Sequence, residues 1–164
     1  MLSTDHVSPE LAEMRSPAEL AEIADPAALR TAVSDYIRAK HWAHGYELLT
    51  PFEHTLRLAF ECARHESRGT LLEEALRGRE RCWELVAALE AIGARSSANA
   101  LRRAHELCAA VPAEDAAKAR STDDWCILLG QEQFAELEAA LIENEVADRL
   151  AAFVSDNKHR LQPD

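Results

Sequence analysis

The sequence predicts an all-α fold, a single compact multi-helix domain over residues 1–164, with short N-terminal helices in 1–25 and the main helical core in 26–160. Hydrophobic residues make up 48% of the chain, and many are alanine, which favours helices over strands. Only five glycines and six prolines interrupt the chain. Apolar residues recur at the spacing of one helical face between these interruptions.

Helix start signals are frequent in the first part of the chain. Each is a Ser, Thr or Asp followed by proline, whose fixed φ suits the first turn of a helix. They begin at Ser8, Ser16, Asp25 and Thr50. Two of them, Ser16 and Thr50, also have glutamate three positions later, which is the capping-box pattern. These signals predict two short helices, a longer one from 26 to about 44, and another from 51 to near Gly69.

The middle of the chain predicts a short segment followed by a helical hairpin. The short segment starts at Thr70, which has glutamate three positions later, and is interrupted at Gly78. The hairpin consists of residues 79–92 and 97–110. Gly93 occupies the position of a left-handed C-cap, and Ser96 or Ser97 is placed to cap the second helix. Pro112 ends the hairpin.

The C-terminal part predicts two more amphipathic helices, over 131–144 and 145–158. A polar connector over 113–122 precedes them. The apolar residues 125–129 lie between, and the pattern assigns them no conformation. No internal repeat or domain linker is present.

The tryptophans and cysteines are expected to be mainly structural. Trp42, Trp83 and Trp125 are expected to pack in the core, although any one of them could be an interface anchor instead. The cysteines are Cys62, Cys82, Cys108 and Cys126. They form no Cys-x-x-Cys pair, so we expect reduced, buried side chains and neither a disulfide framework nor a structural zinc. The sequence has neither a signal-peptide pattern nor a long apolar run, which predicts a cytoplasmic protein.

The net charge of −11 argues against direct binding to nucleic acid or to an anionic membrane, because both would repel an acidic protein. The charge is also unevenly distributed. Residues 106–148 carry eleven acidic and two basic side chains, whereas 30–105 carry ten acidic and twelve basic. Solubility alone does not require this segregation. It suggests a basic partner, with an ordinary solvated surface as the alternative.

An acidic row on the predicted helix 131–144 sharpens this expectation. At about 100° per residue, Glu132, Glu136 and Glu143 fall on one side of that helix and apolar residues on the other. Glu132 and Glu136 repel each other at i,i+4, and no basic residue relieves them locally. We therefore define an acidic face as the candidate partner-binding surface. Its members are Asp123, Asp124, Glu132, Glu136, Glu138, Glu143, Glu19 and Glu22.

A metal-dependent enzyme is the alternative from another class. His54, Glu61 and His65 are seven and four residues apart, which places them on one face of a helix. The recognised motifs His-Glu-x-x-His and Glu-x-x-His are missing, and so are phosphate-binding and nucleophile motifs. The expectation is therefore no metal, no cofactor and no catalytic residue.

The stretch ELVAALEAIGARSSANALRRA, residues 84–104, resembles a segment of a bacterial helical family, the DMP-type family of DNA-mimic proteins. The likeness extends over about residues 45–160. It includes the junction at 89–94, acidic residues at 123 and 124, and the ending LAAFVSDN at 150–157. The family's Asn-Gly-Gly-Phe-like turn is replaced here, with Gly69 alone retained. The resemblance implies an all-α protein whose acidic surface imitates duplex phosphates and covers the DNA-binding face of a transcription regulator.

The leading hypothesis is a non-enzymatic, acidic binding protein that occupies the basic nucleic-acid-binding face of a regulator. An immunity protein that neutralises a cationic toxin is the related alternative. The expected partner is a basic DNA-binding protein or a cationic toxin, with no direct contact with nucleic acid or membrane. The sequence is compatible with a homodimer as well as with a monomer.

Overall fold

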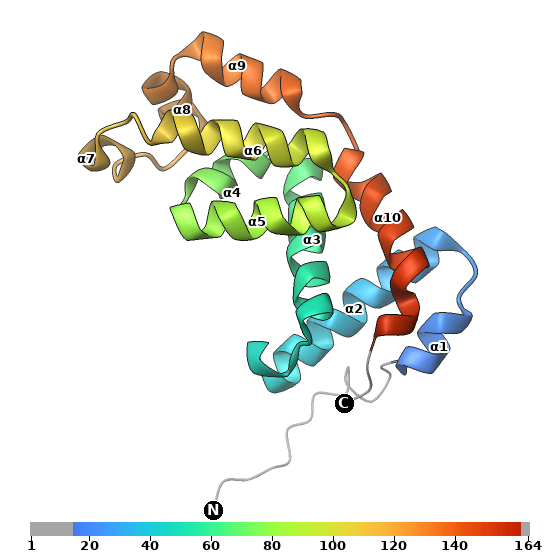
Figure 1. Cartoon of the computed structure of the whole chain (residues 1–164). Coiled ribbons are helices and arrows are strands. Elements are labelled where there is room, and N and C mark those ends of the chain that lie inside the picture. Colours follow the sequence, from blue (N-terminus) through green and yellow to red (C-terminus); the bar gives the residue numbers. More distant parts are fainter. Residues whose placement is uncertain (1–14, 162–164) are drawn as a thin grey trace, which may run out of the picture. The chain divides into compact units, whose positions relative to one another are not determined.

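A computed structural model describes residues 15–161, and these residues form helices without any β-strand (Figure 1). The predicted all-α class is confirmed. The helix expected after Ser8 lies outside the described residues. No helix of residues 15–161 combines the length and apolar character needed to cross a membrane.

The helices follow one another with short connections. They are α1 (Pro17–Glu22), α2 (Pro26–His44), η2 (Tyr46–Leu48), α3 (Pro51–Ser67), α4 (Leu71–Leu76), α5 (Arg79–Ile92), α6 (Arg95–Cys108), α7 (Ala113–Ala116), α8 (Thr122–Leu129), α9 (Gln131–Ala140), α10 (Glu145–Asn157) and η3 (Lys158–Arg160). The predicted breaks near Gly45, Gly69, Gly93 and Pro112 all separate helices. Gly93 has φ +81°, the left-handed C-cap expected of it.

Contacts group the chain into two compact units, so the single domain expected from the sequence stays a prediction. One unit comprises the described residues of 1–57 and 151–164, and the other comprises 58–150. In the first unit α1 packs against α2 and η3. Its core holds Leu20, Leu29 and Val33. A buried ion pair joins Lys40 and Glu53, with 3.3 Å between Nζ and Oε1.

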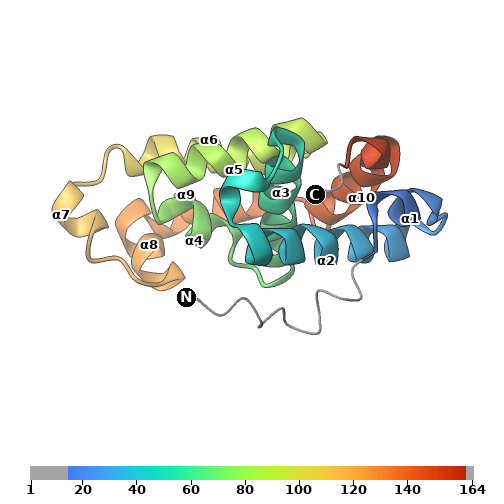
Figure 2. The ribbon, with the colours of Figure 1, turned by 90° about the horizontal axis from the view of Figure 1, so that it is seen from below.

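The second unit is built around the α5–α6 hairpin, which Figures 1 and 2 both show as two helices side by side. α4 packs on both helices of the hairpin, and α9 packs on α6. Leu85, Leu89 and Leu101 are fully buried in this unit because they lie on the inward faces of the hairpin. This packing holds α9 and α4 in place around the candidate site described below.

Most start signals cap their helices as predicted. Ser16 forms a complete capping box on α1, Asp25 accepts the Ala28 N–H, and Thr50 exchanges hydrogen bonds with Glu53. The signal at Thr70 fails, because its hydroxyl hydrogen-bonds with Nδ1 of His65 at 2.8 Å and makes no cap on α4.

Two other expectations about the helices are wrong, and two segments that the pattern did not assign to helices form them. α6 begins at Arg95 without a local side-chain cap, so neither Ser96 nor Ser97 is its N-cap. Residues in the expected polar connector form α7, and a capping box of Ser121 and Asp124 begins α8. α9 stops at Ala140 instead of 144, because the next residue is extended, with ψ 122°.

The expectations for tryptophans and cysteines are only partly confirmed. Trp125 is buried, with 6% of its surface exposed, but Trp42 and Trp83 are 82% and 44% exposed. Trp83 is held at the surface by an edge contact with His105, with ring centroids 5.3 Å apart. The described cysteines are free thiols, of which Cys62 and Cys82 are buried and the other two only partly so.

Candidate functional site

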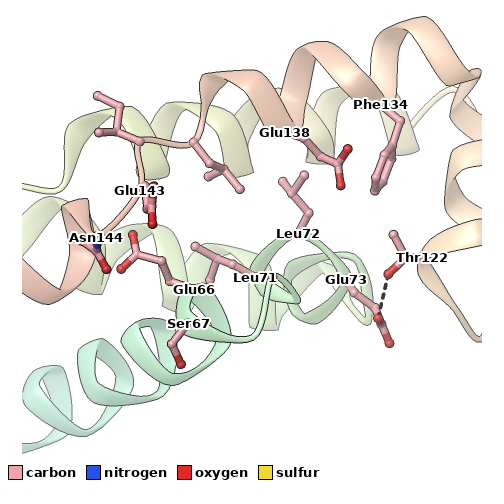
Figure 3. Close-up of a pocket in the computed structure, with 13 residues that line it drawn as sticks. Glu66, Ser67, Leu71, Leu72, Glu73, Thr122, Phe134, Glu138, Glu143 and Asn144 are labelled. Atoms are coloured by element: carbon pink, nitrogen blue, oxygen red, sulfur yellow. Dashed lines mark hydrogen bonds between the residues drawn. The ribbon is translucent and has the colours of Figure 1, made fainter.

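A pocket of about 410 Å³ opens between α4, the end of α3, and α9 with the turn that follows it. Its lining combines apolar side chains with acidic ones (Figure 3). The apolar residues include Leu71, Leu72, Phe134, Leu141 and Ile142. The acidic residues are Glu66, Glu73, Glu138 and Glu143. Among the described residues that line it there is no lysine, arginine or histidine.

The local structure explains how these groups meet. Figure 3 shows Glu143 near one end of the pocket and Glu73 near the other, with Leu72 between them. Leu71 and Leu72 are buried on the inward face of α4, and Phe134 is buried on α9. Glu143 reaches the pocket because the chain leaves α9 after Ala140 and turns through Asn144, which has φ +61°.

Glu66 was not predicted as a site residue, and it has a structural partner. Its carboxylate accepts the backbone N–H groups of Val146 and Ala147 at 3.0 and 3.2 Å, so it caps the start of α10. Burial raises the pKa of Glu66, against the lowering effect of those two hydrogen bonds. The sequence did contain a signal for this residue. An acidic side chain in the last turn of a helix interacts unfavourably with the helix dipole, so its presence there indicates a partner outside that helix.

The other three carboxylates of the pocket, those of Glu73, Glu138 and Glu143, differ in whether they have a hydrogen-bond or ion-pair partner within the protein. Glu73 accepts a hydrogen bond from the hydroxyl of Thr122 at 3.0 Å and lies 3.7 Å from Arg77. Glu138 and Glu143 have neither an ion pair nor a side-chain hydrogen bond with any described residue. Both were predicted as members of the acidic face, and the structure brings them to one pocket.

Glu132 and Glu136 lie one turn apart on α9, and both are exposed as predicted. Because Glu143 lies beyond the end of α9, the continuous helical row of three is wrong. Glu136 lines a second hollow with Arg103, of about 450 Å³. Arg103 is paired with Glu106, with 3.1 Å between the charged atoms.

Two members of the acidic face act as helix caps. The carboxylate of Glu19 accepts the Ser16 N–H in the capping box of α1. Asp124 accepts the N–H groups of Arg120 and Ser121 at 2.8 and 3.0 Å. These hydrogen bonds lower the pKa of both carboxyl groups. The presence of acidic residues at these two positions is therefore explained by helix capping, without a partner protein.

The remaining members of the face, Asp123 and Glu22, are exposed. Glu19 and Glu22 belong to the first unit, whereas the other six residues belong to the second. The second unit therefore carries Asp123 and Asp124 together with the glutamates on and after α9.

The structure brings together only two of the three residues of the alternative metal site, which were His54, Glu61 and His65. Glu61, His65 and Glu74 bring potential ligand atoms within 4.8 Å of one another, and His54 is not part of this group. Glu74 comes from α4, whose return towards α3 was not evident from the spacing within one helix. Its Oε2 is buried without a hydrogen bond, although it lies 3.1 Å from Arg77 and 3.8 Å from His65.

Arg81 makes this cluster a poor cation site. Its guanidinium pairs directly with Glu61 and lies 3.4 Å from Glu74. A metal ion would have to displace this charge or share both carboxylates with it. Burial also lowers the pKa of His65, against the opposing effect of Glu74. The arrangement is that of an ion-pair network which joins α3, α4 and α5.

Comparison of the chain with protein-family models, with curated proteins and with solved structures finds no match. The resemblance to the DMP-type family therefore stays a prediction.

Proposed function

We propose that this chain is a non-enzymatic acidic binding protein of the cytoplasm that covers the nucleic-acid-binding face of a basic regulator, as a DNA mimic does. The observation that carries the proposal is the set of uncompensated carboxylates on and after α9. Glu132, Glu136, Glu138 and Glu143 are exposed, and none has an ion pair with a residue that the structure describes. A partner rich in lysine and arginine would supply the missing charges.

The charges within residues 106–148 support this proposal, because both basic residues there are engaged elsewhere. Lys118 pairs with Asp115 at 3.2 Å. Arg120 donates to the backbone carbonyls of Ala117 and Ala119. Neither is paired with a glutamate of α9. The repulsion between Glu132 and Glu136 is therefore retained in the free protein and would be relieved when a cationic surface binds.

Exposed ion pairs contribute only about 0.2–1 kcal/mol each, so the carboxylates must act collectively. We expect Glu132→Lys with Glu136→Lys and Glu143→Lys to abolish binding, whereas each single change has little effect. The test immobilises the parent and the triple variant and captures proteins from the source cell at low and high salt. Duplex DNA is added as a competitor.

The matched control carries Glu47→Lys, Glu80→Lys and Asp156→Lys. These residues are exposed and lie outside the α9 region, and their substitution changes the net charge by the same amount. The proposal is supported if one basic protein is captured by the parent and the control but not by the triple variant, and if duplex DNA displaces it. Capture that survives the triple reversal, or that DNA does not affect, would overturn it.

A further inference from the structure

We infer that the pocket between α4 and α9 accepts one arginine side chain of the basic partner, together with the residues that flank it. This inference rests on the proposed function, because it specifies how the partner's positive charge is recognised. It adds a discrete contact to what would otherwise be only a diffuse attraction between surfaces.

The chemistry of the lining selects a long cationic side chain with an apolar stem. Glu138 and Glu143 supply negative charge without a partner of their own, and no described lining residue is basic. Leu72, Phe134 and Leu141 supply the apolar surface that the methylene groups of such a side chain need. An acidic solvated surface would not require those apolar groups, and a purely apolar ligand would leave the carboxylates unpaired.

Arginine fits this lining better than lysine. Its planar guanidinium carries five donors, is weakly hydrated and packs against aromatic rings, whereas an ammonium group is a compact and strongly hydrated charge. The volume of about 410 Å³ lies at the lower end of the range for small-ligand pockets. It is larger than one side chain needs and leaves room for the neighbouring residues of a peptide.

The test uses the whole chain and a short capped peptide with a central arginine. Binding is followed at low salt by chemical-shift changes of the backbone amides, with matched peptides that carry lysine or the uncharged norleucine. We expect saturable binding of the arginine peptide at millimolar concentration or below, with shifts at Leu72 and Phe134. The lysine peptide should bind several-fold more weakly, and the norleucine peptide should not bind.

Two double variants with the same change in net charge distinguish binding in the pocket from general electrostatic attraction to the acidic surface. Glu138→Gln with Glu143→Gln should weaken binding of the arginine peptide by about tenfold, as expected for the loss of charge-assisted hydrogen bonds. Glu132→Gln with Glu136→Gln should change it by less than about twofold, because these carboxylates do not line the pocket. Ile142→Ala, at a lining position that is 55% exposed, tests the apolar contribution without affecting the core.

Equal effects of the two double variants, or no preference for arginine over lysine, would overturn the inference. So would spermidine binding that is tighter than that of the arginine peptide and depends on the same two glutamates, because the pocket would then be a small-molecule site. The peptide titration and the capture experiment fail independently. If a partner is captured but the arginine peptide does not bind, only the inference about the pocket is wrong. If the peptide binds but no DNA-competed capture occurs, only the proposed function is wrong.

Discussion

Glu145 caps the start of α6 through Ser97, a residue 48 positions earlier in the chain. The Glu145 carboxylate accepts hydrogen bonds from the Ser97 N–H at 2.8 Å, from the Ser97 hydroxyl at 2.7 Å and from the Ser96 N–H at 3.1 Å. The two serines that lie where a local N-cap is expected are therefore donors to a distant acceptor. This contact joins α10 to the hairpin, just as Glu66 joins α3 to α10.

We predict that Glu145→Ala destabilises the fold by about 1–2 kcal/mol, which is the usual cost of losing an N-cap. Urea unfolding measures this effect, with Glu143→Ala as the control because Glu143 is exposed and caps nothing. The same loss in both variants would contradict a capping role for Glu145.

The cost of Glu145→Ala should also depend on pH. Burial would raise the pKa of Glu145, but the hydrogen bonds from Ser97 and Ser96 outweigh burial and hold that pKa below its usual value. A lowered pKa contributes stability above the unfolded pKa and loses it as pH falls through the folded pKa. The difference between parent and variant should therefore be full at neutral pH and shrink in acid. A difference that grows in acid would exclude this linkage.

The tryptophans should differ sharply in their contribution to stability. We expect Trp125→Ala to cost about 3–5 kcal/mol, because it leaves a cavity in the second unit. Trp42→Ala should change the free energy of unfolding by less than about 0.5 kcal/mol, because 82% of that side chain is exposed. Denaturant titrations of both variants test this order, and similar losses would contradict the exposure of Trp42.

Glycine is required at position 93 because of its positive φ, and not because a larger side chain would clash with neighbouring atoms. A Cβ at this position would meet no atom within 4 Å, but φ is +81°. We expect Gly93→Ala to cost about 1–2 kcal/mol from strain alone. Gly78 precedes α5 with an extended φ of −177°, so Gly78→Ala is the control and should be tolerated. Thermal melts compare the two, and equal loss would argue against a conformational cause.

The thiols should react in an order set by burial. Cys62 is buried, and burial raises its pKa to about 12, so it carries almost no thiolate at mildly alkaline pH. Cys108 and Cys126 are partly exposed and should be modified before Cys62. Native-state labelling with a thiol reagent, followed by peptide mass analysis, tests this. Early labelling of Cys62 would mean that α3 opens more readily than its packing suggests.

Arg81 should keep metal ions from the cluster of Glu61, His65 and Glu74. We expect no stoichiometric zinc or iron in the purified protein, and tighter zinc binding after Arg81→Gln, because the variant removes the competing charge. Metal analysis and competition with a zinc indicator measure both. Stoichiometric zinc in the parent that is lost in His65→Ala would instead favour the metal-dependent enzyme.

The local features of this protein could be predicted from its amino-acid sequence. Helix starts at Ser16, Asp25 and Thr50 and the helix end at Gly93 depend on side chains or torsions within a few residues, and the structure confirms all four. The exposure of Glu132 and Glu136 also followed from the pattern, because apolar spacing identifies the buried side of α9.

The contacts between residues that are distant in the sequence depend on how the helices pack, and they could not be predicted from it. The pocket needs Glu138 and Glu143 near α4, and the ion-pair cluster needs Glu74 beside His65. The burial of Trp125 but not of Trp42 likewise depends on how separate helices pack. Helical periodicity describes one face of one helix and carries no information about its neighbour. The contacts that define the candidate site therefore arise from packing between helices.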